Sequence, residues 1–548
     1  MAAFGSLRRN VVLASCTALV LMGLLLARNL SGMDRFGHVE TNSFWPDSSK
    51  VHNAAAFLSA QTEQEKLGST VKTSRFHFLT PASKSNLQFC YNLASATANR
   101  YPPPVLLGWN GQGEFDAAVT HLAKIRAMKR YLASLTPEED DDLVLMVDGY
   151  DIIHQLPAEV MMERYFDVAA KATALLAERL GLPAHEASRR NIKQTVFFGP
   201  DKICWPPDKR AARCWAAPPS SLGHEAFGPD GGPDDFFSAD PRWLNSGTIM
   251  GPVSDVRRVV DATMEEIEAT YNKTFWQSDS DQYYMANVWG RQEYWRRRSW
   301  IVGSQGGDAG DQEAAQASGW PSSARVIPEK RRGSQEIEMH MAIEYESSLF
   351  QTMFGNEPFL GHLEYSRENE TANVTMDLLG QGGALGWYAM QMPQNVRAAL
   401  MKLYDSVSGT HPGASAEDWI RTVPLGTNLV TKHIYGLWHC TGGKEFLDTE
   451  YRKMWFFPLA RSLAGEAVKA SRRGEALSSR LIDGRKWVAR WAYPGGDQDV
   501  EDWRHGGAWS DEAPGRFVGW TELCGPHESV LFQGQRRRQG QGQEARGN

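Results

Sequence analysis

The stretch DDLVLMVDGYDIIHQLP, residues 141–157, joins an uninterrupted apolar run to two carboxylates. Residues 143–147 are all apolar, and Asp148, Gly149 and Asp151 follow within four positions. A continuous apolar run of this length is typical of a strand that is buried on both faces of a parallel sheet. The two carboxylates are therefore expected just beyond the carboxyl end of a buried strand.

Segments before this strand alternate between strand and helix patterns. The strands are expected at 75–82 and 104–109, and the helices at 86–101 and 115–135. This β-α-β-α-β order predicts an α/β fold with a mostly parallel sheet and helices on both faces. Ligands of such sheets bind beyond the carboxyl ends of the strands, near the point where the strand order reverses. The sequence therefore predicts a binding site beside the two carboxylates.

The chemistry of Asp148 and Asp151 indicates a metal ion. Two carboxylates this close repel each other, and burial makes their ionisation less favourable still. A hard divalent cation removes both penalties and prefers oxygen ligands. Gly149 would let the chain turn tightly between them. The alternative is that Asp148 caps a helix and Asp151 is solvated.

The N-terminal residues suggest a membrane anchor. Residues 11–27, VVLASCTALVLMGLLLA, carry no charge and lie between Arg9 and Arg28. Their length is at the lower limit for crossing a bilayer, and the arginines before them favour a cytosolic N-terminus. We expect a single-pass type II protein of the Golgi or ER membrane, with its bulk in the lumen. The alternative is a cleaved signal peptide.

Composition and cysteine usage agree with a folded lumenal protein. The chain has 548 residues with 19 Trp, enough for a large core, and its net charge of -7 lacks the basic character of nucleic-acid-binding proteins. Cys204 and Cys214 could close a short loop in an oxidising lumen, or remain buried free thiols. Asn272, Asn369 and Asn373 are sequons that a lumenal domain could have glycosylated, and they support the same location.

Further polar motifs follow the later predicted strands. They are FGPDKICWP (198–206), LNSG (244–247), SDQYY (280–284), IEYESSLFQ (343–351) and WHCTGGK (438–444). In the last motif, two glycines allow the backbone to approach a phosphate closely, and Lys444 supplies a positive charge. His439 precedes them, and its alternative fate is that of a packed core histidine.

Together with VDGYD (147–151), these six motifs resemble, in the same order, the glycosyltransferase domain of the collagen-modifying enzymes. That family comprises the lysyl hydroxylase/glucosyltransferases and the related procollagen galactosyltransferases, and the resemblance covers roughly residues 73–457. It implies a GT-A (Rossmann-like) fold. It also implies a metal-dependent glycosyltransferase that moves a sugar from a UDP-sugar to a hydroxyl of a protein or glycan acceptor. The alternative is a catalytically weak, nucleotide- or glycan-binding pseudoenzyme of the same fold.

The resemblance assigns roles to eight residues. It implies that Mn²⁺, with Mg²⁺ as the second choice, is bound by Asp148, Asp151 and His439. The donor-binding residues that it implies are Thr80, Trp109, Lys124 and Lys444. Asp281 is expected to position or deprotonate the acceptor hydroxyl as the catalytic residue.

Departures from the family pattern leave the donor sugar and the acceptor open. Ser280 replaces the first aspartate of an Asp-Asp-Gln motif, Glu344 stands in place of an aspartate, and 440–441 replace Gly-Asn. Two of the assigned residues also have structural alternatives. Trp109 would serve equally as a core aromatic, and Lys124 as a solvated residue on a helix face.

The expected organisation along the chain has six parts. They are a cytosolic tail (1–10), a transmembrane anchor (11–28), a stem (29–72), the catalytic domain (73–457), a Trp-rich appendage without catalytic residues (458–524) and a disordered tail (525–548). Within the catalytic domain, residues 310–335 are rich in Gly, Ser and charge and predict a disordered insertion or lid.

Overall fold

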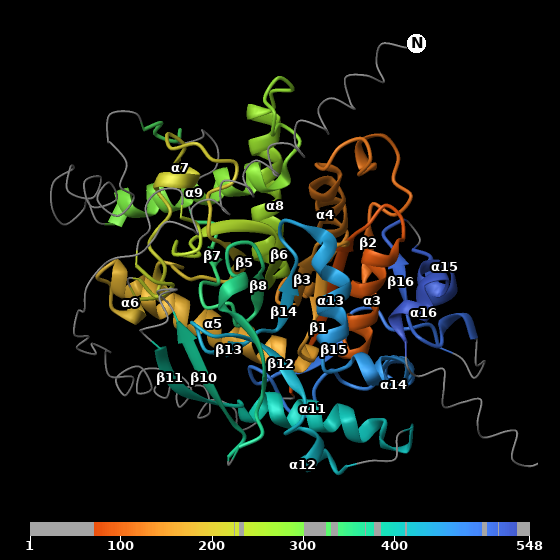
Figure 1. Ribbon diagram of the computed structural model, residues 1–548. Coiled ribbons are helices and arrows are strands. Elements are labelled where there is room, and N and C mark those ends of the chain that lie inside the picture. Colours follow the sequence, from red (N-terminus) through yellow and green to blue (C-terminus); the bar gives the residue numbers. More distant parts are fainter. Residues whose placement is uncertain are drawn as a thin grey trace, which may run out of the picture. The chain divides into compact units, whose positions relative to one another are not determined.

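The computed structural model describes residues 71–533, apart from 224, 230–234, 301–324, 330–337, 368, 378–384, 411–413, 496–500 and 513–514 (Figure 1). The chain divides into two units, Met1–Leu67 and Gly68–Asn548, and every described residue belongs to the second. The predicted cytosolic tail, anchor and nearly all of the stem lie outside the described residues, as does most of the insertion at 310–335. None of the described helices is both long and apolar enough to span a membrane.

A nine-stranded sheet forms the centre of this unit. Its strand order is β17-β16-β2-β1-β3-β6-β5-β7, and β15 also pairs with β1. The strands are β1 (Thr73–Pro81), β2 (Val105–Leu107), β3 (Leu143–Val147), β5 (Val196–Asp201), β6 (Trp243–Pro252), β7 (Met341–Ile343), β15 (Lys486–Ala489), β16 (Gly507–Ser510) and β17 (Phe517–Gly519). Most pairings are parallel, but β6 runs antiparallel to both β3 and β5. The prediction of an α/β fold with a mostly parallel sheet is confirmed.

The strand order reverses at β1. The chain passes from β1 through α3 (Leu87–Ala98) to β2 on one side of β1. It then passes through α4 (Ala123–Ala133) to β3 on the other side of β1. The carboxyl ends of β1 and β3 therefore form a topological switch point, where α/β sheets bind ligands. Asp148 follows β3 directly at this point.

Strand β3 is buried on both faces, as its apolar run predicts. Val144 and Met146 belong to a core shared with α4, α8 (Val253–Thr270) and α9 (Asp281–Trp300). Leu143, Leu145 and Val147 belong to a second core shared with α5 (Ala158–Arg179). The helices α8 and α9, in green in Figure 1, also pack against each other. Alternate side chains of β3 thus anchor two separate helical layers.

The helix predicted at 115–135 is shorter in the structure, and α4 begins only at Ala123. The segment before it is held by Asp279, which accepts hydrogen bonds from the Thr120 hydroxyl and, at 2.9 Å, from the His121 backbone N–H. Because these groups bond to a side chain distant in sequence, a loop forms where the apolar spacing favoured a helix. The helix expected at 86–101 is present as α3, and a further helix, α9, begins at Asp281.

The C-terminal segment contributes to the sheet itself. Strand β15 pairs with β1, β16 pairs with β2, and β17 extends the edge beyond β16. A disulfide between Cys90 and Cys524 joins α3 to α15 (Trp520–Cys524). The expected appendage at 458–524 is therefore an integral part of the sheet and core.

The predicted disordered tail begins too early. Residues 525–533 continue the fold through a short 3-10 turn (Gly525–His527) and α16 (Glu528–Leu531). Leu531 and Phe532 are buried in the main core. The polar residues that follow, 534–548, lie outside the described residues. The basic, Gln-rich composition of the end of the chain obscured the two apolar residues that anchor this helix.

The tryptophan of β15 provides a test of this architecture. Trp487 is 1% exposed, packs against Phe166 and donates its indole N–H to the Ile482 carbonyl at 2.9 Å. Trp487→Ala should lower the free energy of unfolding by about 3–5 kcal/mol, because it leaves a cavity and an unpaired carbonyl. Urea denaturation followed by circular dichroism measures this change. Leu481→Ala, at a side chain that is 52% exposed, is the control and should change stability by less than about 0.5 kcal/mol. Equal stability of the Trp487 variant and wild type would contradict the placement of β15.

Candidate metal centre

The turn after β3 lies against helix α3 and the neighbouring strands β6 and β1. The Asp148 backbone N–H donates to the Gly247 carbonyl on β6 at 2.8 Å, and the Asn92 side chain donates to the Asp148 carbonyl at 3.0 Å. A Cβ on Gly149 would lie 2.2 Å from the Pro81 carbonyl oxygen at the end of β1. Glycine is therefore required at this position because the turn passes directly over β1.

A second strand pair brings His439 to Asp151. Strand β4 (Ile152–His154) pairs antiparallel with β14 (Leu437–His439), so that His439 lies opposite Ile152. The backbone N–H of Cys440 donates to the Asp151 carbonyl at 2.8 Å. This pairing explains how a histidine late in the sequence reaches the turn after β3.

Asp148, Asp151 and His439 meet with metal-binding geometry. Each offers one ligand atom, and the three atoms lie within 4.8 Å of one another. Among the described residues, the buried Oδ1 of Asp151 has no hydrogen-bond partner. A Cβ on Gly247 would lie 2.2 Å from Cε1 of His439 and 2.8 Å from Oδ2 of Asp148, so glycine leaves this space open. The three side chains together can hold a metal ion.

Both predicted lysines contact these carboxylates. Nζ of Lys124 lies 2.6 Å from Oδ1 of Asp148 and 2.9 Å from Oδ2 of Asp281. Nζ of Lys444 lies 2.6 Å from Oδ2 of Asp151. The Lys124 side chain is only 10% exposed, so the alternative of a solvated helix face is wrong. The Lys444 side chain is 42% exposed and can turn toward a ligand.

The two carboxylates after β3 differ in their electrostatic environment. Burial raises the pKa of Asp148; the Lys124 ammonium opposes that shift, while Asp151 and Asp281 add to it. Burial also disfavours the charge of Asp151, but His439 and Lys444 outweigh it and hold the pKa of that carboxyl well below its usual range. Ionisation is therefore least favourable at Asp148, and a cation bound beside that carboxylate would stabilise its charged form.

Asp281 lies at the first turn of α9, next to the same lysine. It accepts a hydrogen bond from the Ser246 hydroxyl at 2.8 Å. Burial opposes its ionisation, but Lys124 and the Ser246 hydroxyl hold its pKa below the usual value. The predicted catalytic carboxylate is thus ionised and joined to Asp148 through Lys124.

Asp201 is a fourth carboxylate of the site, and sequence reasoning did not assign it a role. It ends β5, is 8% exposed, and accepts hydrogen bonds from the side-chain amides of Asn245 and Gln282. Burial raises the pKa of Asp201 to about 6, although these two amides oppose the shift. Its position at the carboxyl end of an apolar strand was the available signal, and it matches that of Asp148.

Thr80 and Trp109 lie at the carboxyl ends of the neighbouring strands. Thr80 is the penultimate residue of β1 and is 1% exposed, and Trp109 follows β2 and is 6% exposed. Trp109 packs in the main core, as its structural alternative predicts. However, the Thr80 hydroxyl and the Trp109 indole N–H are both buried and lack a hydrogen-bond partner in the described part of the chain. Both therefore retain capacity to bond a ligand.

A second cluster of His77, Glu139 and Asp142 also has metal-ligand spacing. Its carboxylates already face guanidinium groups, because Arg490 contacts Glu139 and Arg75 lies 3.7 Å from both acids. These charges make the second cluster less favourable for a cation than the first.

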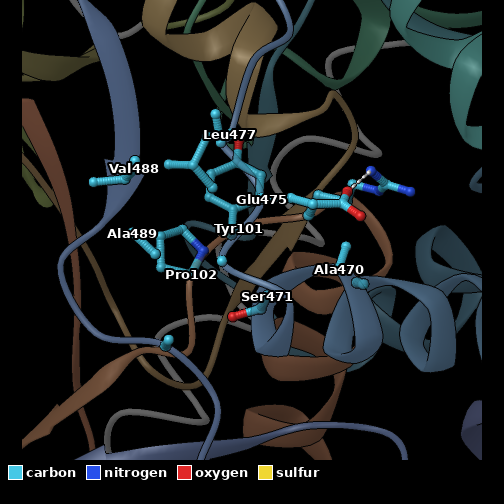
Figure 2. Close-up of a pocket in the computed structure, with 13 residues that line it drawn as sticks. Tyr101, Pro102, Ala470, Ser471, Glu475, Leu477, Val488 and Ala489 are labelled. Atoms are coloured by element: carbon cyan, nitrogen blue, oxygen red, sulfur yellow. Dashed lines mark ion pairs between the residues drawn. The ribbon is translucent and has the colours of Figure 1, made fainter. Parts of the chain in front are cut away.

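The cavity in Figure 2 lies at the opposite end of the sheet. Tyr101 and Pro102, which line it, precede β2, and Val488 pairs with Arg75 near the start of β1. Figure 2 shows the ion pair of Glu475 with Arg100, whose closest atoms are 3.8 Å apart. Its lining shares no residue with the carboxylate cluster after β3.

Comparisons with known proteins leave the site to be interpreted from its own geometry. A scan against models of protein families gives no match, and a search of curated proteins gives none either.

Asparagine substitutions distinguish the two carboxylates. In metal-free protein, Asp151→Asn should lower the free energy of unfolding by about 1–2 kcal/mol, because it removes the partner of His439 and Lys444. Asp148→Asn should not lower it, because it removes a destabilised charge. Both variants should lose Mn²⁺ affinity by at least about a hundredfold in calorimetric titrations.

Asp142→Asn in the second cluster is the matched control, and its Mn²⁺ affinity should equal that of wild type. Loss of Mn²⁺ binding in that variant alone would assign the metal to His77, Glu139 and Asp142 instead.

Proposed function

We propose that this chain is a metal-dependent glycosyltransferase of GT-A type, which moves a sugar from a UDP-sugar to a hydroxyl of a protein or glycan acceptor. One observation carries the proposal: Asp148, Asp151 and His439 converge at the switch point of an α/β sheet, with a lysine on each carboxylate. The inverted strand β6, inserted between β3 and β5, contributes the Asn-Ser-Gly segment to the same cluster. The resemblance to the collagen-modifying transferases is part of this proposal.

The donor set suits Mn²⁺, with Mg²⁺ as the alternative. Two carboxylate oxygens and an imidazole nitrogen leave coordination positions for diphosphate oxygens. The ion, when bound, supplies Lewis acidity that stabilises the leaving diphosphate. The half-exposed Lys444 is suited to turn from Asp151 to a diphosphate oxygen, and Lys124 holds Asp148 and Asp281 in place.

The nucleoside and the acceptor would lie on either side of this centre. On one side, the unpartnered Thr80 hydroxyl and Trp109 N–H are suited to the polar atoms of uridine. On the other side, Asp281 is oriented by Ser246 and Lys124, which suits it to position the acceptor hydroxyl. Asp201, with a pKa of about 6, is a second carboxylate able to accept the proton of that hydroxyl.

The substitution of Ser280 supports a second candidate function, that of a nucleotide- or glycan-binding pseudoenzyme. The Ser280 hydroxyl accepts a hydrogen bond from the Tyr283 backbone N–H at 3.3 Å, so it caps α9 where the resemblance has a carboxylate. On the acceptor side, catalysis would then depend on the carboxylates of Asp281 and Asp201. Release of UDP from a UDP-sugar distinguishes the enzyme from the binding protein.

The proposed location is the lumen of the Golgi or ER, with attachment through the N-terminal anchor. Two disulfides, Cys90–Cys524 and Cys204–Cys214, support an oxidising compartment.

Calorimetric titration of UDP tests the proposed donor site. Wild type should bind UDP in the presence of Mn²⁺ and lose at least about a hundredfold in affinity when the metal is chelated. Asp151→Asn should bind UDP weakly in either condition. Asp261→Asn, which changes a surface carboxylate with a side chain that is 47% exposed, should behave as wild type. Metal-independent UDP binding of equal strength in wild type and Asp151→Asn would refute the proposed donor site.

A further inference from the structure

Two exposed tryptophans form a corner on the surface. Trp205 and Trp276 are 37% and 66% exposed, whereas the other tryptophans whose burial the structure describes are buried or partly buried. Their ring centroids lie 5.6 Å apart and their planes meet at 89°. Paired apolar rings that remain open to solvent are characteristic of binding surfaces.

Chain connectivity places this tryptophan corner beside the acceptor side of the site. Trp205 follows Asp201 by four residues, and Trp276 precedes Asp281 by five. Even a fully extended segment of this length spans no more than about 18 Å. The second path is shorter, because it turns at the hydrogen bonds from Ser278 to Phe275 and from Ser280 to Gln277. Each tryptophan therefore lies within about 18 Å of one of the two carboxylates, a separation that a glycan of several sugar residues would bridge.

Both rings are held in place by their neighbours. The Cys204–Cys214 disulfide closes the loop that carries Trp205. Phe275 packs against Trp276 and also against Tyr283 of α9, at 6.2 and 4.9 Å between centroids. The guanidinium of Arg213 in turn lies 4.8 Å from the Tyr283 ring. A surface fixed in this way loses little conformational entropy when a ligand binds.

We propose that Trp205 and Trp276 bind a pyranose ring of a neutral glycan acceptor. The apolar C–H face of a sugar ring packs on the negative face of an indole, and the second indole, at a right angle, meets the edge of the same ring. The hydroxyl groups at the rim of this sugar stay in water, and the following residues of the glycan extend toward Asp281 and Asp201. This inference rests on the proposed function and selects a glycan over a protein as the acceptor.

The surroundings of the rings favour a sugar over a peptide. An extended peptide gains much of its affinity from hydrogen bonds to an open strand edge. Trp205 and Trp276 lie in loops, outside every strand of the described residues. A neutral sugar needs only ring faces and a polar rim, which this corner supplies.

Saturation-transfer NMR with lactose, maltose and N,N′-diacetylchitobiose, in the presence of UDP and the diamagnetic ion Mg²⁺, tests the proposal. At least one of these disaccharides should bind to wild type. Trp276→Ala and Trp205→Ala should weaken that binding by at least about tenfold, while Trp276→Tyr, which keeps an aromatic face, should retain part of it. Leu481→Ala is the control. Leu481 is an exposed apolar residue beside the turn that precedes β15, and the variant should bind the disaccharide as wild type does.

The outcomes separate the two proposals. Disaccharides that fail to bind while UDP and Mn²⁺ still bind would overturn the glycan acceptor and leave the donor site intact. Disaccharide binding that depends on Trp276 without any UDP binding would support the sugar site and refute the transferase. Binding of a proline-rich peptide to the same tryptophans, without any disaccharide binding, would assign the corner to a protein acceptor and overturn the inference.

Discussion

The repulsion between carboxylates at the end of β3 is the constraint on which the site depends. Asp281 adds a third carboxylate to Asp148 and Asp151, and burial opposes the ionisation of all three. The fold compensates with two lysines from different elements, Lys124 from α4 and Lys444 from the turn after β14. The compensation is uneven, and it leaves Asp148 with the least favourable environment. Because the negative charge of Asp148 is the least compensated, binding of a further cation at this centre is favourable.

Two glycines make this arrangement sterically feasible. Gly149 lets the turn cross the end of β1, and Gly247 leaves room between β6, His439 and Asp148. Neither requirement arises from an unusual backbone angle. Both follow from three strands, β1, β3 and β6, that deliver their polar groups to one point. Asp151 is the most enclosed of the three carboxylates, with a side chain that is 11% exposed against 35% for Asp148 and 20% for Asp281, so charge interactions are screened least around it.

Local pattern was sufficient for some features and insufficient for others. The apolar run of β3 and the carboxylates after it predicted the sheet and the position of the site, because both depend on adjacent residues. His439 joins the site through the β4–β14 pairing, which no local pattern contains, and it was found through a resemblance in motif order. Asp201 was missed because its role depends on amides from two other elements, Asn245 and Gln282. The start of α4 was misplaced for the same reason, since a distant aspartate, Asp279, holds the preceding loop.

The late strands of the sheet have a consequence for how the protein is made. Strands β1 and β2 leave the ribosome early, but β15 and β16, which complete their hydrogen bonding, are among the last described segments to be synthesised. Until then the nascent chain presents unpaired strand edges, which invite pairing with other chains. We therefore expect chaperones to bind the N-terminal third of the chain throughout its elongation. Premature termination near residue 480 would then yield an aggregating product rather than a shorter working one.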